Sequence, residues 1–187
     1  SPFQGCSSLT KIEIPEGVTA VPAYTFRGCT SLKEVVLPER VTSIGTYAFD
    51  GCTDLTKINL VEGITAIPAY AFRDCTSLGE LVLPSSIVSV GNYAYYNCIG
   101  LRTITMNEGL ESIGSYAFYG CDGVLSLVLN EGLQTISNNA FSDCDNLKAV
   151  ELPSGITSMG QNVFDDCPKL TIYCYSGTEA HMVSESE

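Results

Sequence analysis

The chain has 187 residues, of which 45% are hydrophobic and 16% are charged, so it can bury a sizeable core and is not a disordered tail. Acidic residues outnumber basic ones 21 to 9, which gives a net charge of −12 at pH 7. This charge repels phosphate backbones and anionic lipid, and no apolar run reaches the roughly 18 residues of a membrane span. We therefore expect no nucleic-acid partner and no insertion into a membrane.

Eight of the nine cysteines recur at a constant interval of 23 residues, and other columns keep the same step. An aromatic residue lies three positions before each of these cysteines, and Leu or Val lies three positions after it. A fixed period of roughly 20 to 50 residues is the signature of a solenoid or a related array. The sequence therefore predicts one elongated array of about eight coils over residues 1–175, and not two globular domains. The eight cysteines are Cys6, Cys29, Cys52, Cys75, Cys98, Cys121, Cys144 and Cys167.

The first predicted element of each unit is a strand. In residues 32–37, Leu-Lys-Glu-Val-Val-Leu, the alternation predicts that Val35 and Leu37 point inward while Glu34 and Val36 point outward. Pro38 then stops the strand, because proline cannot donate a hydrogen bond to a continuing ladder.

A second short strand and a helical turn complete the predicted unit. Residues 41–44 are extended and carry two inward aliphatic side chains, and Gly45 turns the chain into residues 46–52. Phe49 and Cys52 lie three positions apart, which is the spacing of one face of a helical turn. A single coil cannot bury its apolar side alone, so the fold must be stabilised by stacking of neighbouring coils.

The unit Leu-x-x-Ile-x-Ile-Pro, followed by Val-Thr-x-Ile-x-x-Tyr-Ala-Phe-x-x-Cys, closely resembles the 23-residue leucine-rich repeats of the BspA-like type. The resemblance covers residues 3–175, with departures at Tyr95, Val124, Asn139 and Asn162. It implies a leucine-rich-repeat solenoid of the alpha-beta horseshoe type, mainly β, with a parallel sheet. Proteins of this family are mostly secreted or surface-exposed bacterial proteins, linked to adhesion and to binding of host or matrix proteins. The family shares no set of ligand residues.

The two ends differ from the repeats. Residues 176–187 lose the apolar columns, which suits a degenerate C-terminal cap or tail. Residues 1–3 enter a repeat in mid-turn without a signal peptide. The resemblance implies an extracellular or cell-surface location, and we expect a signal peptide upstream of this segment.

No catalytic constellation is visible. Nucleophilic catalysis needs a base beside the nucleophile, and His181, the one histidine, lies outside the repeat register. Phosphate-binding and dinucleotide-binding glycine motifs are missing, so we expect neither an enzyme nor a cofactor. Repeated glutamates and the pairs Asp143/Asp145 and Asp165/Asp166 suit a solvated edge better than calcium, because the calcium-loop pattern is absent.

The cysteines favour buried free thiols over metal ligands or disulfides, because tight Cys-x-x-Cys spacing is absent. Cys174 differs, since its spacing places it in an outward column with Val36, Val82 and Val128. It is predicted to be either an exposed thiol or a partner of Cys167, and the sequence leaves both alternatives open.

The outward strand positions are the best interaction candidates, because their side chains lie on a continuous sheet and are not needed to pack the core. The alternative is that they are only good strand formers on a solvated face. A stacked tyrosine column (Tyr24, Tyr47, Tyr70, Tyr93, Tyr116) is a second candidate, for which rings lying flat with hydroxyls in water is the favoured interpretation. The partner-binding candidates are Glu13, Glu34, Val36, Asn59, Glu80, Val82, Thr105, Val128 and Glu151.

The predicted function is a non-catalytic binding or adhesion module that recognises a host or matrix protein, or a glycan, through its solenoid surface. The alternative is a purely structural spacer that holds another domain away from the cell surface. An apolar or charged patch on the sheet face would favour binding, and a uniformly polar face would favour the spacer. The sequence leaves the oligomeric state open.

Overall fold

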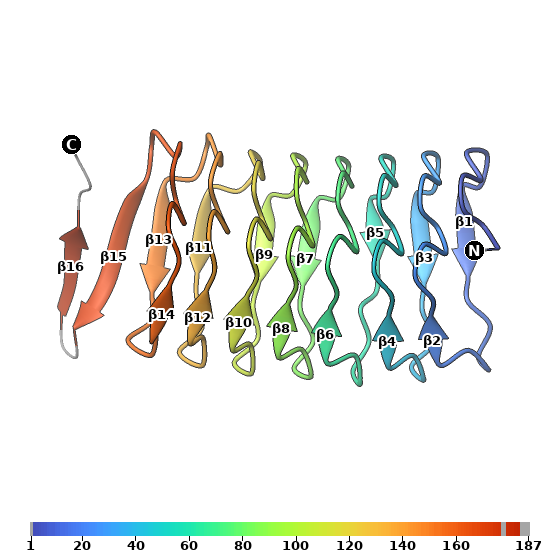
Figure 1. Ribbon diagram of the computed structural model, residues 1–187, viewed down its shortest axis with the longest axis horizontal. Helices are drawn as coiled ribbons and strands as arrows, with labels where there is room; N and C mark the ends of the chain where they lie inside the picture. Colours follow the sequence, from blue (N-terminus) through green and yellow to red (C-terminus); the bar gives the residue numbers. More distant parts are fainter. Residues whose placement is uncertain (1, 177–178, 184–187) are drawn as a thin grey trace.

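The computed structural model describes residues 2–176 and 179–183. The chain winds into a parallel β-solenoid of about seven turns, each of roughly 23 residues. Each turn contributes one strand to each of two rows, and the turns stack along the long axis of the molecule (Figure 1). The predicted solenoid is confirmed. The eighth unit supplies a strand to the first row but no complete turn.

The first row, called the main row here, contains the longer strands. Neighbouring strands pair in parallel, except that the third strand does not pair with the fourth, nor the fifth with the sixth. Paired residues are 23 positions apart, as in Lys11↔Glu34 and Glu80↔Thr103. This register places the same position of every repeat in one line across the row. The strands are β1 (Lys11–Glu13), β3 (Glu34–Val36), β5 (Lys57–Ile58), β7 (Glu80–Val82), β9 (Thr103–Thr105), β11 (Ser126–Val128), β13 (Ala149–Leu152) and β15 (Thr171–Ser176).

The second row, called the short row, consists of two-residue strands that pair in the same parallel register, except that its second and third strands are not paired with each other. Their second residue is buried in every coil except the last, where Met159 is exposed. The strands are β2 (Ala20–Val21), β4 (Ser43–Ile44), β6 (Ala66–Ile67), β8 (Ser89–Val90), β10 (Ser112–Ile113), β12 (Thr135–Ile136) and β14 (Ser158–Met159).

The register changes at the C-terminal end. Ala149 pairs with Thr171, only 22 positions later, and Cys174 therefore pairs with Leu152 instead of Glu151. A shift of one residue moves a side chain to the other side of a strand, so the expected outward placement of Cys174 is wrong. β15 then pairs antiparallel with β16 (Glu179–Val183), the last strand of the sheet (Figure 1).

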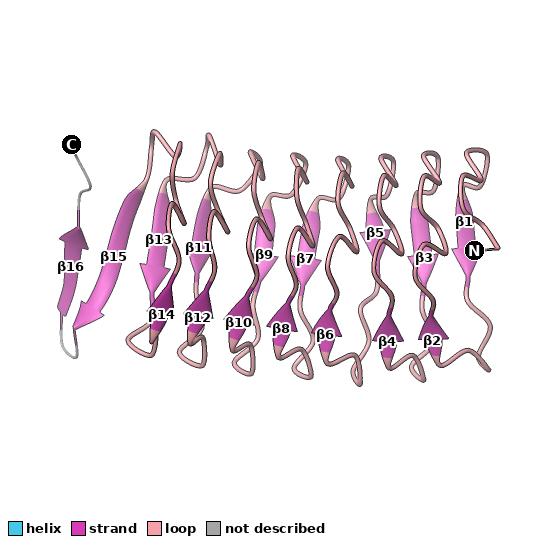
Figure 2. Cartoon of the chain, viewed as in Figure 1, coloured by secondary structure: helices cyan, strands magenta, loops and turns pink. Residues whose placement is uncertain are grey.

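The predicted helical turn is also wrong: the described residues contain strands and turns but no helix (Figure 2). The amides of Tyr24, Phe26 and Gly28 donate to carbonyls of the next coil, at 2.7–3.0 Å. These bonds between coils replace the bonds to the fourth preceding residue that a helix needs. Tyr24 and Gly28 also have φ values of 60° and 72°, which interrupt a right-handed helix.

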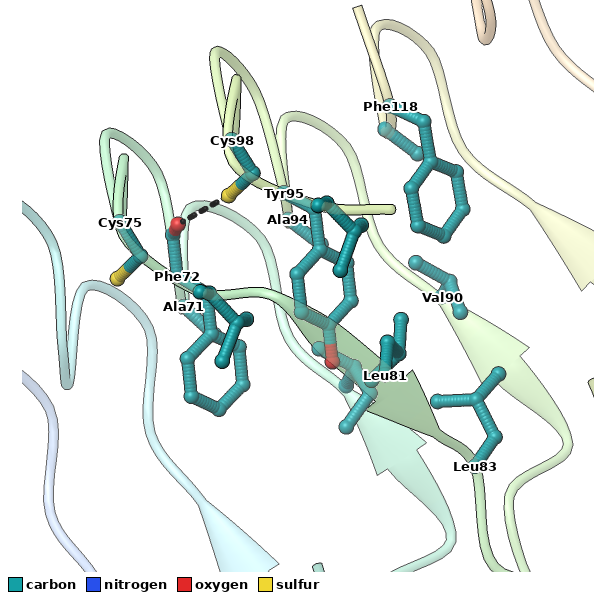
Figure 3. Close-up of a cluster of buried hydrophobic side chains, with 14 of the residues drawn as sticks. Ala71, Phe72, Cys75, Leu81, Leu83, Val90, Ala94, Tyr95, Cys98 and Phe118 are labelled. Carbon is teal, nitrogen blue, oxygen red and sulfur yellow. Dashed lines mark hydrogen bonds between the residues drawn. The ribbon is translucent and has the colours of Figure 1, made fainter. Parts of the chain in front are cut away.

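Columns of identical positions form the core. Eight aromatic rings, from Phe3 to Phe164, stack with centroids 5.1–5.6 Å apart. Figure 3 shows Tyr95 between Phe72 and Phe118 in this stack. The cysteine of each coil donates its thiol to the carbonyl of the aromatic residue in the preceding coil, as Cys98 does to Phe72 at 3.2 Å (Figure 3). Aromatic stacking and thiol bonds thus connect adjacent coils.

All nine cysteines are free thiols, but the expectation that eight of them are buried holds only inside the array. Cys29 to Cys144 are buried, and burial raises the pKa of Cys52 and Cys121 to about 12. Cys6 is exposed and Cys167 is partly exposed, because each lies in an end coil with a neighbour on one side only.

Candidate functional site

The outer face of the main row holds all nine partner-binding candidates. The parallel register brings Glu13 beside Val36, Val82 beside Thr105, and Val128 beside Glu151. The three valines are the exposed apolar residues of these strands, with 38% of Val36, 53% of Val82 and 63% of Val128 accessible. The face therefore alternates apolar and polar side chains along the solenoid.

Part of this face is occupied by contacts within the chain. Lys11 Nζ lies 3.2 Å from a Glu13 oxygen and 3.4 Å from a Glu34 oxygen. Asn59 accepts a hydrogen bond from the Leu37 amide at 2.7 Å and donates one to the Leu37 carbonyl at 2.9 Å. The Asn59 side chain thus continues the strand pairing where β5 ends at Ile58. These contacts give three of the nine candidates a structural role.

The C-terminal part of the face contains a groove, called the Val128 groove here. It encloses about 160 Å³ at the carboxyl ends of β11 and β13. Val128 and Glu151 were predicted from the sequence, whereas Asn130 was not. Glu108 and Glu131 were visible only as part of a repeated glutamate column that suggested a solvated edge. The residues of the groove used below are Glu108, Val128, Asn130, Glu131, Glu151 and Pro153.

The tyrosine column forms a continuous stack along the turns. The rings of Tyr24, Tyr47, Tyr70, Tyr93 and Tyr116 lie 4.5–5.0 Å apart and are within 7° of parallel. Each ring face inside the stack therefore covers its neighbour. The three inner rings therefore offer no open face on which a sugar ring could stack.

An ion cluster beside this stack was missed by sequence reasoning. Asp50 is 3% exposed and accepts hydrogen bonds from Arg27 Nε at 2.8 Å and from Arg73 Nε at 2.7 Å. The bond to Asp50 raises the pKa of Arg73. The signal was present, because the three residues occupy one column in consecutive coils with alternating charge. The carboxylate joins three coils.

The C-terminal aspartates do not assemble a metal centre: within the described ranges, no three His, Cys, Asp or Glu side chains are placed to hold an ion. Burial, together with the neighbouring charges of Asp145 and Asp143, raises the pKa of Asp122. A hollow of about 840 Å³ lies at the C-terminal end of the core, where Met159, Phe164 and several aspartates line it. It lies where the apolar columns of the core end.

Residues 2–176 and 179–183 include no helix long and apolar enough to cross a membrane.

Comparison with known proteins agrees with this architecture. The profile of the BspA type leucine rich repeat region matches residues 1–124 and 65–180, in six copies. No curated protein has a significantly similar sequence.

Several solved structures share the fold. The T. pallidum leucine-rich repeat protein is 33% identical, with a TM-score of 0.82 over 87% of this chain and 78% of that one. A leucine-rich repeat protein from Bacteroides ovatus is 22% identical, with a TM-score of 0.74 over 93% of this chain. A leucine-rich cell surface protein from Faecalibacterium prausnitzii is 25% identical, with a TM-score of 0.65 over 95% of this chain.

The chain spans 57% of the length of the Bacteroides ovatus protein and 62% of the Faecalibacterium prausnitzii protein. The family of these repeats is generally non-catalytic and includes bacterial cell-surface proteins. From its repeat profile and its stacked 23-residue coils, the chain belongs to the BspA-type leucine-rich repeat family.

Proposed function

We propose that this chain is a non-catalytic binding or adhesion segment of a cell-surface or secreted bacterial protein. It recognises a protein partner through the outer face of the main row. The observation that carries the proposal is the line of exposed valines, Val36, Val82 and Val128, on a face built of paired strands. A structural spacer would not need apolar side chains in water at these positions.

The backbone beneath these side chains supports a binding role. Strand residues are held by hydrogen bonds to adjacent coils and by the buried columns below, so ordering them on binding costs little. Apolar contacts occur on every second coil, about 9–10 Å apart from the spacing of strands. This spacing suits an extended protein segment better than a small molecule.

A surface location fits the similarity to a cell surface protein from Faecalibacterium prausnitzii. The partner of such a segment is a host or matrix protein. A glycan partner is less well supported, because the ring faces of the tyrosine column cover one another.

The experiment is a screen of the purified array by biolayer interferometry against matrix proteins and glycans. Once a partner is found, Val82→Asp and Val128→Asp should each weaken binding by roughly 1 kcal/mol or more. Both positions face solvent, so the thermal midpoint should stay unchanged. Tyr70→Ala serves as the comparison variant. Unchanged affinity in both valine variants, with a loss in Tyr70→Ala, would move the interface to the tyrosine column.

A further inference from the structure

The column of regularly spaced cysteines ends in an open coil. Cys167 is partly exposed, whereas Cys144, the cysteine of the preceding coil, is buried. After Cys167 the chain forms β15 and then reverses direction into the antiparallel strand β16 (Figure 1). Within the described ranges, no further coil therefore stacks on the turn that contains Cys167. The last thiol of the column can be reached from outside the core.

A hollow leads to this thiol. The space of about 840 Å³ at the end of the core is lined by Cys167, by apolar side chains such as Phe164 and Leu170, and by four aspartates. Pockets that bind small organic molecules enclose roughly 300–1,000 Å³, so the hollow is large enough for one. The aspartates disfavour an anionic molecule. A neutral or cationic small molecule can thus approach the Cys167 sulfur.

The sulfur of Cys144 lies one coil away, at the same position of the repeat. Cys144 donates its thiol to the Phe118 carbonyl at 3.4 Å. Cys167 makes the equivalent bond to the Phe141 carbonyl at 3.3 Å. Equivalent atoms of adjacent coils are about 4.8 Å apart, from the spacing of parallel strands. Disulfide-linked cysteines have Cα atoms roughly 4.4–6.8 Å apart, so the register allows a bond between these two sulfurs once their side chains rotate.

This pair differs from the rest of the column in the contact between its thiols. The bonds from the buried thiols to the aromatic carbonyls lengthen along the chain, from 3.0 Å at Cys29 to 3.4 Å at Cys144. The Cys144 thiol also donates to the Cys167 sulfur. This hydrogen bond lowers the pKa of Cys167, although burial and the nearby Asp143 and Asp166 act in the opposite direction. Cys167 therefore forms the nucleophilic thiolate more readily than a thiol inside the array.

We propose that Cys167 and Cys144 form a thiol–disulfide exchange site for low-molecular-weight disulfides. Cys167 loses its proton to water, and its thiolate attacks one sulfur of the external disulfide, whose S–S bond breaks to release a small thiolate. The Cys144 sulfur then attacks Cys167 in this mixed disulfide. The bond between Cys167 and the small molecule breaks, and the second small thiolate leaves with the Cys144 proton. Two protein thiols are thereby oxidised to one disulfide, and the external disulfide is reduced to two thiols.

The exchange site is separate from the binding face. Cys144 and Cys167 belong to the turns, whereas the exposed valines belong to strands of the main row. The two proposals therefore stand or fail independently.

The test is treatment of the folded chain with cystamine, a cationic disulfide that the aspartates of the hollow do not repel. After acid quenching and labelling of the remaining thiols, peptide mass spectrometry identifies the modified and linked cysteines. We expect a Cys144–Cys167 disulfide as the main product within the chain, while the buried cysteines from Cys29 to Cys121 stay unmodified. A Cys167–Cys174 disulfide as the main product, or an unmodified Cys167, would overturn the proposal.

Two variants separate the steps. Cys144→Ala keeps a small apolar side chain in the core and should stop the reaction at the mixed disulfide between Cys167 and cysteamine. Cys167→Ser should leave Cys144 unmodified, because Cys144 is buried and reacts only through Cys167. The thermal midpoint of each variant shows whether it is folded, and the linked peptide of the unsubstituted chain needs no variant. Modification of Cys144 in folded Cys167→Ser would contradict the order of steps.

Cys6, at the other end of the array, is the matched control. It is exposed, and its buried neighbour Cys29 donates to the Phe3 carbonyl at 3.0 Å. Burial is the largest cause of the raised pKa of Cys29, and its thiol makes no hydrogen bond to the Cys6 sulfur in the described part of the chain. The mixed disulfide at Cys6 should therefore be converted at least about tenfold more slowly than that at Cys167. Equal conversion at both ends would show that the thiol contact is not what forms the site.

Discussion

The N-terminal and C-terminal halves of the solenoid share one core but differ in whether their acidic side chains form ion pairs. In the first half, Lys11 bridges Glu13 and Glu34, and Asp50 binds both Arg27 and Arg73. In the second half, the described carboxylates have no such cationic partners. The buried aromatic and aliphatic columns run through both halves, with Tyr95 in place of Phe and Val124 in place of Leu.

The turn side also changes along the chain, after Tyr116. One position has φ between 56° and 60° in every full coil, and it is tyrosine in the first five and asparagine, Asn139 and Asn162, in the last two. Asparagine tolerates this conformation better than tyrosine, so the turn itself does not require an aromatic ring. In the first half the Arg27 guanidinium lies 5.5 Å from the Tyr47 ring centroid, and that of Arg73 lies 5.7 Å from Tyr70.

This difference shows that stacking requires the same buried columns in both halves. The surface columns are not constrained in this way and can differ in charge and in the contacts that they make. Where charged side chains join coils, they are paired within the molecule. Where they are unpaired, they remain available to a partner. Four stability measurements test this division.

The largest effect should come from the shared core. Leu55→Ala and Leu147→Ala remove fully buried side chains from the two halves, and each should lower the free energy of unfolding by roughly 2–5 kcal/mol. Urea unfolding monitored by circular dichroism measures both losses. A loss in one half only would show that the core is not equivalent along the array.

The next effect should come from Asp50. Asp50→Asn leaves two guanidinium groups without their carboxylate, so it should lower the free energy of unfolding by about 2 kcal/mol. Asp54→Asn, at an exposed position without an ion pair among the described residues, is the control and should change it by no more than about 0.5 kcal/mol. Equal effects would contradict a structural role for the Asp50 cluster.

A gain is expected at Tyr95. Its hydroxyl is buried without a hydrogen-bond partner among the described residues, between the rings of Phe72 and Phe118. Tyr95→Phe should therefore raise the free energy of unfolding by about 1 kcal/mol. The reverse change, Phe72→Tyr, should lower it. Destabilisation by Tyr95→Phe would show that the hydroxyl has a partner in solution, such as a bound water.

The smallest effect should come from the groove carboxylates. Glu108→Gln/Glu131→Gln/Glu151→Gln should change the free energy of unfolding by no more than about 0.5 kcal/mol. None of the three forms an ion pair among the described residues, and the two hydrogen bonds from Ser154 to Glu131 are exposed. Thermal melts at low and high salt measure it, and any gain should be larger at low salt. A loss near that of Asp50→Asn would mean that these carboxylates hold the coils together, which would remove the contrast between the halves.

Sequence reasoning succeeded where a property depends on position within the repeat. The 23-residue step predicted the parallel register and the outward placement of Val36, Val82 and Val128, because every coil places equivalent residues in line. It failed for the helical turn. The three-residue spacing of Phe49 and Cys52 also fits a chain whose alternate amides bond to the next coil, and local spacing does not distinguish the two.

The predictions for Cys174 and Asn59 were wrong for a different reason. Cys174 was placed by counting, and the register shift between β13 and β15 moved it by one position. Asn59 was taken as a free surface residue, but its carboxamide bonds both backbone groups of Leu37 in the preceding coil. Neither the register shift nor these side-chain hydrogen bonds recur with the 23-residue period, so the repeat pattern does not predict them.

The sequence by itself determined the repeat length, the buried columns and the row of outward strand positions, because stacking makes these properties periodic and each coil repeats them. Only the tertiary structure decided which of the outward residues act together. It brought Glu108, Val128, Asn130 and Glu151 to one groove, left the Asn130 Oδ1 without a donor among the described residues, and gave Asp50 two arginines from adjacent coils. Such groupings depend on side-chain conformations and hydrogen bonds between coils, which are set by local packing and not by the period.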